Sequence, residues 1–272
     1  MDWWQAILLG LVQGLTEFLP VSSSGHLLIF QEILGADAEG FLDFTVTVHL
    51  ATVLATLVVF WGAIWQLLKG FFRFKYNDET DYICKILVSL IPVALVGLLF
   101  KDQVEMLFSG ALWQVGIGLC VTALLLLVSD QAGKRIKTPV AKDVRNGISY
   151  WQAFTVGVAQ AVAVCPGISR SGSTIATGLL TGVRREAMAQ FSFLMVLIPI
   201  IGEQGLDLVR VATGHAGFGA GVGVLPLVLG FLAAFLSGLF ACKVMIALVK
   251  KAKLQWFALY CFVVAVLIFI LS

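Results

Sequence analysis

Long apolar runs without charged residues follow one another along most of the chain. Runs free of Asp, Glu, Lys and Arg cover residues 44–68, 86–100, 106–129, 146–169, 187–202, 211–242 and 254–272. A helix that crosses a bilayer needs about 20 largely apolar residues. The runs 86–100 and 187–202 reach that length only with their flanking residues. The pattern therefore predicts an all-α polytopic membrane protein with about six transmembrane helices.

The N-terminal region has a different pattern. Residues 3–16 and 18–31 form two short apolar pieces, which are separated by Glu17 and interrupted by Pro20 and a run of serines. Each piece is too short to cross a bilayer, so together they predict a helix-loop-helix unit that enters the membrane and turns back. Irregular backbone at that depth is tolerated only where protein or a water-filled cavity surrounds it.

An internal repeat predicts a second unit of the same kind. Shifted by 147 residues, WQAILLGLVQGLTEFLPVSSSG at 4–25 aligns without gaps with WQAFTVGVAQAVAVCPGISRSG at 151–172. The identical pairs are Trp4/Trp151, Gln5/Gln152, Ala6/Ala153, Gly10/Gly157, Gln13/Gln160, Ser22/Ser169, Ser24/Ser171 and Gly25/Gly172. Apolar composition explains matches of Ala and Gly, but not of Trp, Gln and Ser in register. We therefore expect re-entrant pieces at 146–169 and 171–183, broken at Pro166.

The repeat also predicts how the two halves are related. Three predicted spans lie between the two copies and three follow the second, and an odd number of crossings inverts the second copy, as in inverted-topology repeats. We expect a single integral membrane domain over residues 1–272. It would consist of two inverted repeats, at about 1–130 and 148–272, joined by a basic cytoplasmic loop at 130–147.

The distribution of charge agrees with this topology. All but three of the 18 lysines and arginines fall on the side of the loop 130–147, whereas Lys101 and Arg210 fall opposite and Arg170 lies at depth. The positive-inside rule makes the basic side cytoplasmic. If both helix-loop-helix units crossed fully, the basic residues at 134–145 and 184–185 would lie on opposite sides. The charges therefore favour two re-entrant units.

Composition excludes several other classes of protein. The chain is 60% hydrophobic and 12% charged, with a mean hydropathy of +0.98, whereas soluble domains are about 25% charged. Such hydrophobicity excludes a disordered chain, and a net charge of +2 is too weak for a nucleic-acid-binding protein. Five scattered cysteines predict no disulfide framework. No basic residue precedes the apolar segment 3–16, which argues against a cleaved signal peptide.

Polar residues gather in the two re-entrant loops, although an ionisable residue at a membrane-helix centre costs about 2.5–3.5 kcal/mol. Gln13 and Glu17 are four residues apart and share one helical face. The segment PVSSSGH then supplies Ser22, Ser23, Ser24 and His26, and PGISRSGST supplies Ser169, Arg170, Ser171, Gly172, Ser173 and Thr174. Each serine-rich loop lies where a new half-helix begins, and helix N-termini carry free N–H groups and a positive dipole end.

These residue types point to phosphate chemistry. Two helix N-termini that face one cavity form an anion site, and the planar guanidinium of Arg170 suits phosphate. Glu17 would repel a phosphate unless Mg²⁺ or Ca²⁺ binds both, and His26 titrates near neutral pH. A hydroxyl, an imidazole, a carboxylate and a guanidinium around one anion indicate phosphoryl transfer or phosphate-ester hydrolysis.

Structural explanations compete with this hypothesis. Serines before a half-helix often only cap it, which applies to Ser22 and Ser24. Gln13 is also explained as a hydrogen-bonded core amide, and a pair of Glu17 with Arg170 could simply hold the loops together. For His49, alone in a long apolar run, a hydrogen-bonded core histidine is favoured over a cavity residue.

The segments QGLTEFLPVSSSGH and PGISRSGST resemble the signature segments of the undecaprenyl-diphosphate phosphatases, the bacitracin-resistance family. The resemblance extends over nearly the whole chain. It implies hydrolysis of undecaprenyl diphosphate to undecaprenyl phosphate, the lipid carrier of cell-wall synthesis, and a dependence on Mg²⁺ or Ca²⁺. It also implies a place in the bacterial inner membrane among membrane lipids, with a site open to the periplasm; a homodimer is a further possibility.

The resemblance assigns roles to individual residues. Its glutamate falls on Glu17 and its Glu-or-Gln position on Gln13, and both would hold the metal. Its serine, histidine and arginine positions fall on Ser23, His26 and Arg170. We expect Ser23 to attack phosphorus, with His26 as its base or as the rival nucleophile. Arg170 would grip the diphosphate with help from Ser22, Ser24, Ser169, Ser171, Gly172, Ser173 and Thr174.

Three other functions compete with this interpretation. Type-2 phosphatidic-acid phosphatases share a Ser-Gly-His, here Ser24 to His26, but need Ser-Arg, five further residues and then a histidine, a position where this chain has Ala176. An inverted-repeat transporter of a phosphorylated polyprenyl lipid would share the architecture, but would need no nucleophile such as Ser23 with His26. A non-catalytic lipid-binding protein is the weakest rival.

Overall fold

The computed structural model describes residues 1–36, 40–100, 103, 106, 112–135, 145–212, 222–251 and 253–271. These residues form helices, with no strand among them. The α-helices are α1 (Trp3–Phe18), α2 (Ser23–Leu34), α3 (Phe41–Phe71), α4 (Asp78–Leu99), α6 (Leu112–Arg135), α7 (Tyr150–Val162), α8 (Arg170–Leu180), α9 (Arg185–Ala212), α10 (Val224–Lys251) and α11 (Gln255–Leu271), and a short 3-10 helix η1 covers Arg145–Gly147. The predicted all-α class is confirmed.

In the described part of the chain, five helices are long and apolar enough to cross a membrane, namely α3, α4, α6, α9 and α10. The last helix, α11, is equally apolar but has only 17 residues. The prediction of about six spans therefore corresponds to five such helices and this shorter one. The number and hydropathy of these helices indicate a multi-pass membrane protein.

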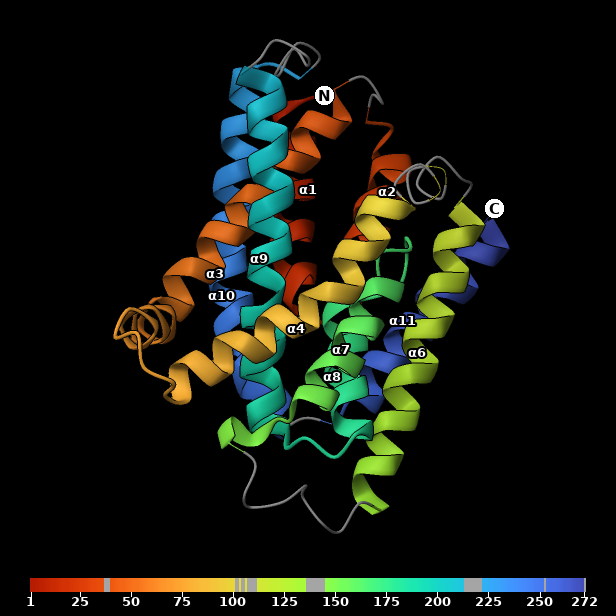
Figure 1. Cartoon of the computed structure of the whole chain (residues 1–272). Coiled ribbons are helices and arrows are strands. Elements are labelled where there is room, and N and C mark those ends of the chain that lie inside the picture. The colour runs from red at the N-terminus through yellow and green to blue at the C-terminus, as the bar shows by residue number, and fades with distance from the viewer. Residues whose placement is uncertain are drawn as a thin grey trace.

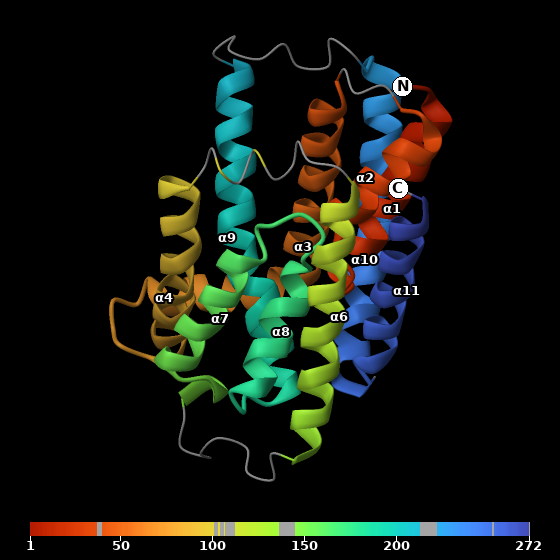
Figure 2. The ribbon, with the colours of Figure 1, turned by 90° about the vertical axis from the view of Figure 1, so that its right-hand side faces the viewer.

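Two helical hairpins, α1–α2 and α7–α8, are too short to cross. Their helices have 16, 12, 13 and 11 residues, and at 1.5 Å per residue none reaches the roughly 30 Å of a bilayer core. Figure 1 shows α1 and α2 in the upper half of the molecule and α7 and α8 in the lower half. In Figure 2 the connection between α7 and α8 is directed toward the middle of the molecule. The two hairpins thus approach each other from opposite ends.

The same interaction closes both hairpins. The Nε2 atom of Gln5 donates to the carbonyl oxygen of Leu34 at 2.9 Å, and Nε2 of Gln152 donates to that of Thr181 at 2.8 Å. Both members of each pair are shifted by the 147 residues that relate the two sequence copies. This correspondence supports the predicted repeat. Its inversion, and the division into units at about 1–130 and 148–272, stay predictions; residues 136–144 of the joining loop lie outside the described part.

Glycines let each hairpin pack closely against a long helix. The first hairpin packs along α10 and the second along α4. A Cβ atom at Gly10 would collide with the carbonyl oxygen of Gly230, and one at Gly157 would collide with that of Ser89. Small residues allow such close approach between membrane helices. The glycine identity in the two sequence copies therefore has a packing reason at both positions.

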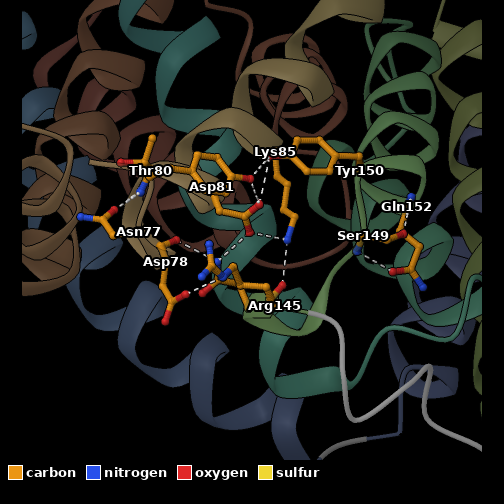
Figure 3. A network of polar contacts seen from close by, with 11 residues as sticks. Asn77, Asp78, Thr80, Asp81, Lys85, Arg145, Ser149, Tyr150 and Gln152 are labelled. Atoms are coloured by element: carbon orange, nitrogen blue, oxygen red, sulfur yellow. Dashed lines mark hydrogen bonds and ion pairs between the residues drawn. The ribbon is translucent and has the colours of Figure 1, made fainter. Parts of the chain in front are cut away.

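A buried polar network fixes the start of the second hairpin to α4 (Figure 3). The ammonium of Lys85 donates to Oδ2 of Asp81 at 2.6 Å and to the carbonyl oxygen of Arg145 at 2.7 Å. The hydroxyls of Tyr76 and Tyr150 donate to Oδ1 of the same carboxylate at 2.7 and 3.0 Å. Because Asp81 and Lys85 are only 3% and 2% exposed, this pair depends on these partners for its hydrogen bonds.

Candidate active site

The loops of the two hairpins meet at a small polar cavity. Its lining consists of Thr16, Glu17, Leu19, Ser22, Ser23, Ser24, His49, Ala163, Ile168, Ser169, Arg170 and Ser171. The hairpins also touch directly, because the hydroxyl of Ser171 donates to the carbonyl oxygen of Leu19 at 3.1 Å. The structure thus brings Glu17, Ser23 and Arg170 to one cavity, although 153 residues separate the first from the last.

Glu17 lies in the last turn of α1, and its carboxylate collects hydrogen bonds. Oε2 accepts from the Ser23 hydroxyl at 2.5 Å and from Nε2 of Gln13, one turn earlier, at 2.8 Å. The helix ends at Phe18, since the residue before Pro20 is biased toward extended backbone. The chain can therefore turn at once and bring Ser23 back to the carboxylate.

A strained residue directs this turn. Ser22 has φ = +68°, which is uncommon for a residue other than glycine and costs roughly 1–3 kcal/mol. Its hydroxyl oxygen accepts from the amide of Gly25 at 3.4 Å and caps α2. Ser23 is the first residue of that helix, so its hydroxyl lies at a helix N-terminus beside Glu17.

The second loop is held by α6. The amide of Ser169 donates to the hydroxyl oxygen of Thr122 at 2.9 Å, and that hydroxyl lies 3.2 Å from the carbonyl oxygen of Gly167. Gly167 has φ = +81°, and a Cβ atom there would collide with the backbone of Val115. Ser169 caps α8 by accepting from the amide of Gly172 at 3.1 Å. Arg170 therefore begins a helix whose positive end faces the cavity.

Three of the predicted substrate-binding residues lie behind this lining. Gly172 packs against Ser169 and Pro20. The hydroxyl of Thr174 lies 2.6 Å from that of Ser192, and the buried hydroxyl of Ser173 has no hydrogen-bond partner among the described residues. Their contact with substrate stays a prediction.

The structure does not bring His26 to the Ser23 hydroxyl. Its ring is 2% exposed and lies outside the cavity lining given for the described residues. Nδ1 is 2.8 Å from the carbonyl oxygen of Ser22, and Nε2 is 2.8 Å from the hydroxyl of Tyr260. With both ring nitrogens occupied, this histidine supports the loop, and its role as base or nucleophile stays a prediction.

His49 lines the cavity instead, although its position in an apolar run favours a core histidine. Its Nδ1 is 2.8 Å from the carbonyl oxygen of Thr45, so the expected hydrogen-bonded histidine is present. Its Nε2, however, lies 3.8 Å from Oε2 of Glu17. One sequence feature does indicate a functional role for His49: it is an isolated ionisable residue in an apolar span, and such residues within membranes are commonly functional.

The oxygens around Glu17 fit a hard divalent cation, although only in part. Among the described residues, no group of three His, Cys, Asp or Glu side chains could hold a metal. The buried Oε1 of Gln13, however, has no hydrogen-bond partner in the described structure, and the contacts given above leave Oε1 of Glu17 for another ligand. Mg²⁺ commonly binds one or two carboxylates together with waters and substrate phosphates. Gln13 and Glu17 match that kind of site.

A second cavity, small and mainly apolar, adjoins the polar one. The two cavities share Glu17, Arg170 and Ser171. The rest of its lining comes from α1, α3 and α9 and consists of Phe18, Thr52, Val53, Thr56, Ser192, Phe193, Val196, Leu197 and Ile200. The polar residues thus stand at the boundary between a hydrophilic and a hydrophobic space.

Comparisons with known proteins agree with these features. The family model "Bacitracin resistance protein BacA" matches residues 6–267. A Bacteroides fragilis protein named undecaprenyl-diphosphatase is 50% identical over 272 residues, covering 100% of this chain and 99% of the relative. Proteins of the same name are 51% identical over 261 residues in Parabacteroides distasonis (96% and 95% covered) and 40% over 273 residues in Carboxydothermus hydrogenoformans (100% and 98%). The chain therefore belongs to the BacA family of bacitracin resistance proteins.

Proposed function

We propose that this membrane protein hydrolyses undecaprenyl diphosphate to undecaprenyl phosphate and inorganic phosphate. The observation that carries the proposal is the Ser23 hydroxyl, hydrogen-bonded to Oε2 of Glu17 at 2.5 Å in a cavity that Arg170 also lines. The name shared by the relatives supports the same activity. A transporter or a lipid-binding protein would need the cationic side chain and the helix N-termini, but no hydroxyl placed on a carboxylate.

The two adjoining cavities suit the two parts of such a substrate. The diphosphate would bind in the polar cavity, at Arg170 and the N-terminus of α8, where hydroxyls of Ser22, Ser24 and Ser169 can donate hydrogen bonds. The prenyl chain would start in the apolar cavity between α3 and α9. Burial of the prenyl chain stabilises the complex by about 25 cal/mol per Å² of apolar surface removed from water. Arg170 and the N-terminus of α8 hold the charged group.

In the first step, Ser23 attacks the terminal phosphorus. Its Oγ forms the new bond to phosphorus, and the bond from that phosphorus to the bridging oxygen breaks. Glu17 accepts the hydroxyl proton through the hydrogen bond already present and passes it to the departing undecaprenyl phosphate. Arg170 offsets the charge that develops on the phosphoryl oxygens. In the second step, water cleaves the phosphoserine, releases phosphate and restores the Ser23 hydroxyl.

Gln13 and Glu17 would hold the divalent cation that the family resemblance implies. When bound there, Mg²⁺ or Ca²⁺ offsets the charge of the diphosphate and of the carboxylate. The support for this assignment is the pair of oxygens described above, and in particular the unpaired Oε1 of Gln13.

A measurement of phosphate release tests the function. The protein is purified in detergent and given undecaprenyl diphosphate with Mg²⁺ or Ca²⁺, in parallel with chelator. We expect phosphate release that stops with the chelator, and none from undecaprenyl phosphate, which lacks the anhydride bond. Substrate that stays intact with both cations would contradict the proposal, and movement of the unhydrolysed lipid between the leaflets of proteoliposomes that hold the protein would favour a transporter.

The proposed location is the bacterial inner membrane, with the cavity open to the periplasm and residues 130–147 in the cytoplasm. The support is the excess of basic residues on one side of the predicted topology. Single cysteines at positions 37, 143 and 207, in a cysteine-free background, test it with an impermeant thiol reagent. Labelling at 37 and 207 but not at 143 is expected. Positions 37 and 143 lie outside the described residues, and a homodimer stays a prediction.

A further inference from the structure

His49 faces the two hairpins across the polar cavity. It lies on α3, which contributes no other residue to this lining in the described structure, and its side chain is 15% exposed. The carboxylate of Glu17 lies close to it, with Oε2 3.8 Å from Nε2 of the imidazole. The ring therefore borders the space in which the phosphoryl group would react.

The partner of Nδ1 determines what Nε2 can do. Thr45 presents a carbonyl oxygen, which only accepts hydrogen bonds, at 2.8 Å from Nδ1. Nδ1 must therefore carry the proton. In the neutral ring the other nitrogen is then an acceptor, so a lone pair on Nε2 is directed toward the cavity and toward Glu17.

Nε2 and the carboxylate oxygen do not bond to each other. Their separation of 3.8 Å is too long for a hydrogen bond. Two acceptors at this separation are both satisfied by a molecule that donates one hydrogen to each. A water about 2.8 Å from both atoms meets this condition.

We propose that His49 is a further catalytic residue, which together with Glu17 holds the water that hydrolyses the phosphoserine. The inference rests on the function proposed above. Before the first step, Oε2 of Glu17 accepts from Ser23 and Gln13. Once Ser23 is phosphorylated, its hydroxyl hydrogen is gone and Oε2 can accept from a water instead. The site for the second nucleophile thus forms from the product of the first step.

The atoms of this second step balance without a change of charge on His49. The water oxygen bonds to phosphorus, and the bond from phosphorus to Oγ of Ser23 breaks. The hydrogen donated to Glu17 passes through the carboxylate to Oγ and restores the serine hydroxyl. The hydrogen donated to Nε2 stays on the phosphate that leaves. His49 therefore orients the water, and no net proton transfer to the ring is required.

Neither His26 nor Arg170 can hold this water in place of His49. Both nitrogens of His26 have partners. The guanidinium of Arg170 only donates hydrogen bonds, so it cannot hold a water by one of its hydrogens. His49 is thus suited to this task by an acceptor atom that points into the cavity.

Separate measurement of the two products tests the inference. Purified full-length protein with Mg²⁺ receives undecaprenyl diphosphate that carries ³²P in its terminal phosphate. In the His49→Leu variant we expect a rapid burst of about one undecaprenyl phosphate per protein. Free phosphate should appear at least about a hundredfold more slowly than in the wild type, because a misplaced reactant costs that order in rate. The label should accumulate on Ser23, where mass spectrometry can locate it.

Two more substitutions separate this role from a structural one. His49→Gln supplies an acceptor at a similar distance from the backbone and should restore phosphate release to within about tenfold of the wild type. Thr45→Val replaces a hydroxyl on the same helical face by a methyl group but keeps the carbonyl oxygen used by Nδ1, and should leave both product rates unchanged. Thermal unfolding in detergent shows whether each variant is folded.

Each of these results either supports or overturns the role proposed for His49. A folded His49→Leu protein that releases both products at the wild-type rate, or that slows both equally without phosphoserine, would overturn the inference. So would a His49→Gln protein as slow as His49→Leu. If the wild type itself releases no phosphate, it is the proposed function that fails.

Discussion

The Nε2 atom of His26 lies 2.8 Å from the hydroxyl of Tyr260, which follows 234 residues later in the chain. The two rings also stack, with centroids 5.6 Å apart and an angle of 10° between their planes. Nδ1 of the same histidine is 2.8 Å from the carbonyl oxygen of Ser22. The ring therefore links α11 to the strained residue that precedes Ser23, and through it the C-terminal helix supports the position of the nucleophile.

Tyr260→Phe should test this support with little change in shape. The stacked ring remains and one hydrogen bond is lost, so we expect the free energy of unfolding to fall by about 1 kcal/mol and turnover to stay within a few-fold. His26→Ala removes the stack and both hydrogen bonds and should lower stability and turnover much further. Thermal unfolding and phosphate release measure the two effects. If Tyr260→Phe were as inactive as a nucleophile variant, the tyrosine hydroxyl would belong to the chemistry.

Ser23→Ala should abolish turnover while the substrate still binds. The variant removes the attacking hydroxyl, whereas Arg170 and the N-terminus of α8 keep their places. Equilibrium binding of labelled undecaprenyl diphosphate and phosphate release can be measured on the same preparation. Ser24→Ala, the neighbouring serine of the lining, is the matched control and should cost far less. Near-normal turnover in Ser23→Ala would assign the attack to another group, such as His26 or a water.

Arg170→Lys should lower kcat/KM at least about tenfold, which corresponds to about 1.4 kcal/mol of transition-state stabilisation. The charge is kept, but a lysine cannot contact two phosphate oxygens with a planar fork. Steady-state kinetics across substrate concentrations measures the loss. Wild-type kinetics in this variant would remove the guanidinium from the site.

Glu17→Gln should lower activity and raise the metal concentration needed for half of it. The shape and one hydrogen-bonding oxygen remain, but the charge that attracts a divalent cation and accepts the Ser23 proton is lost. A titration with Mg²⁺ and one with Ca²⁺ give the half-activity concentrations. Gln13→Glu is the informative counterpart, because a second carboxylate should lower that concentration. Wild-type activity that survives a chelator would contradict the metal role of both residues.

The sequence predicted the two hairpins and much of the cavity for identifiable reasons. Trp, Gln and Ser in register at a fixed shift showed the repeat, and the spacing of Gln13 and Glu17 placed both on one helical face. Two re-entrant units that enter the membrane from opposite sides bring their loops together within it. These inferences needed only local periodicity and the rule that polar residues within a membrane must face protein or water.

The orientation of the two histidines could not be predicted in the same way. His26 lies in the serine-rich motif, but its ring turns to Tyr260, a contact that depends on how α11 packs. His49 lies in an apolar run, and only the packing of α3 against α1 brings it to Glu17. The left-handed backbone of Ser22 likewise depends on its surroundings, because a serine does not favour that conformation. Long-range packing therefore decided which imidazole faces the cavity.

Lys85→Met should destabilise the protein by about 3–5 kcal/mol, because it leaves the buried carboxylate of Asp81 without its cationic partner. The double variant with Asp81→Leu removes both charges and should recover much of the loss. An exposed ion pair in the same network provides the control: Arg145 and Asp78 approach to 2.7 Å, but their side chains are 46% and 67% exposed. Asp78→Asn should cost less than about 1 kcal/mol. Thermal unfolding in detergent compares the three proteins, and equal losses for the buried and the exposed pair would mean that burial does not set the strength of the contact between α4 and the second hairpin.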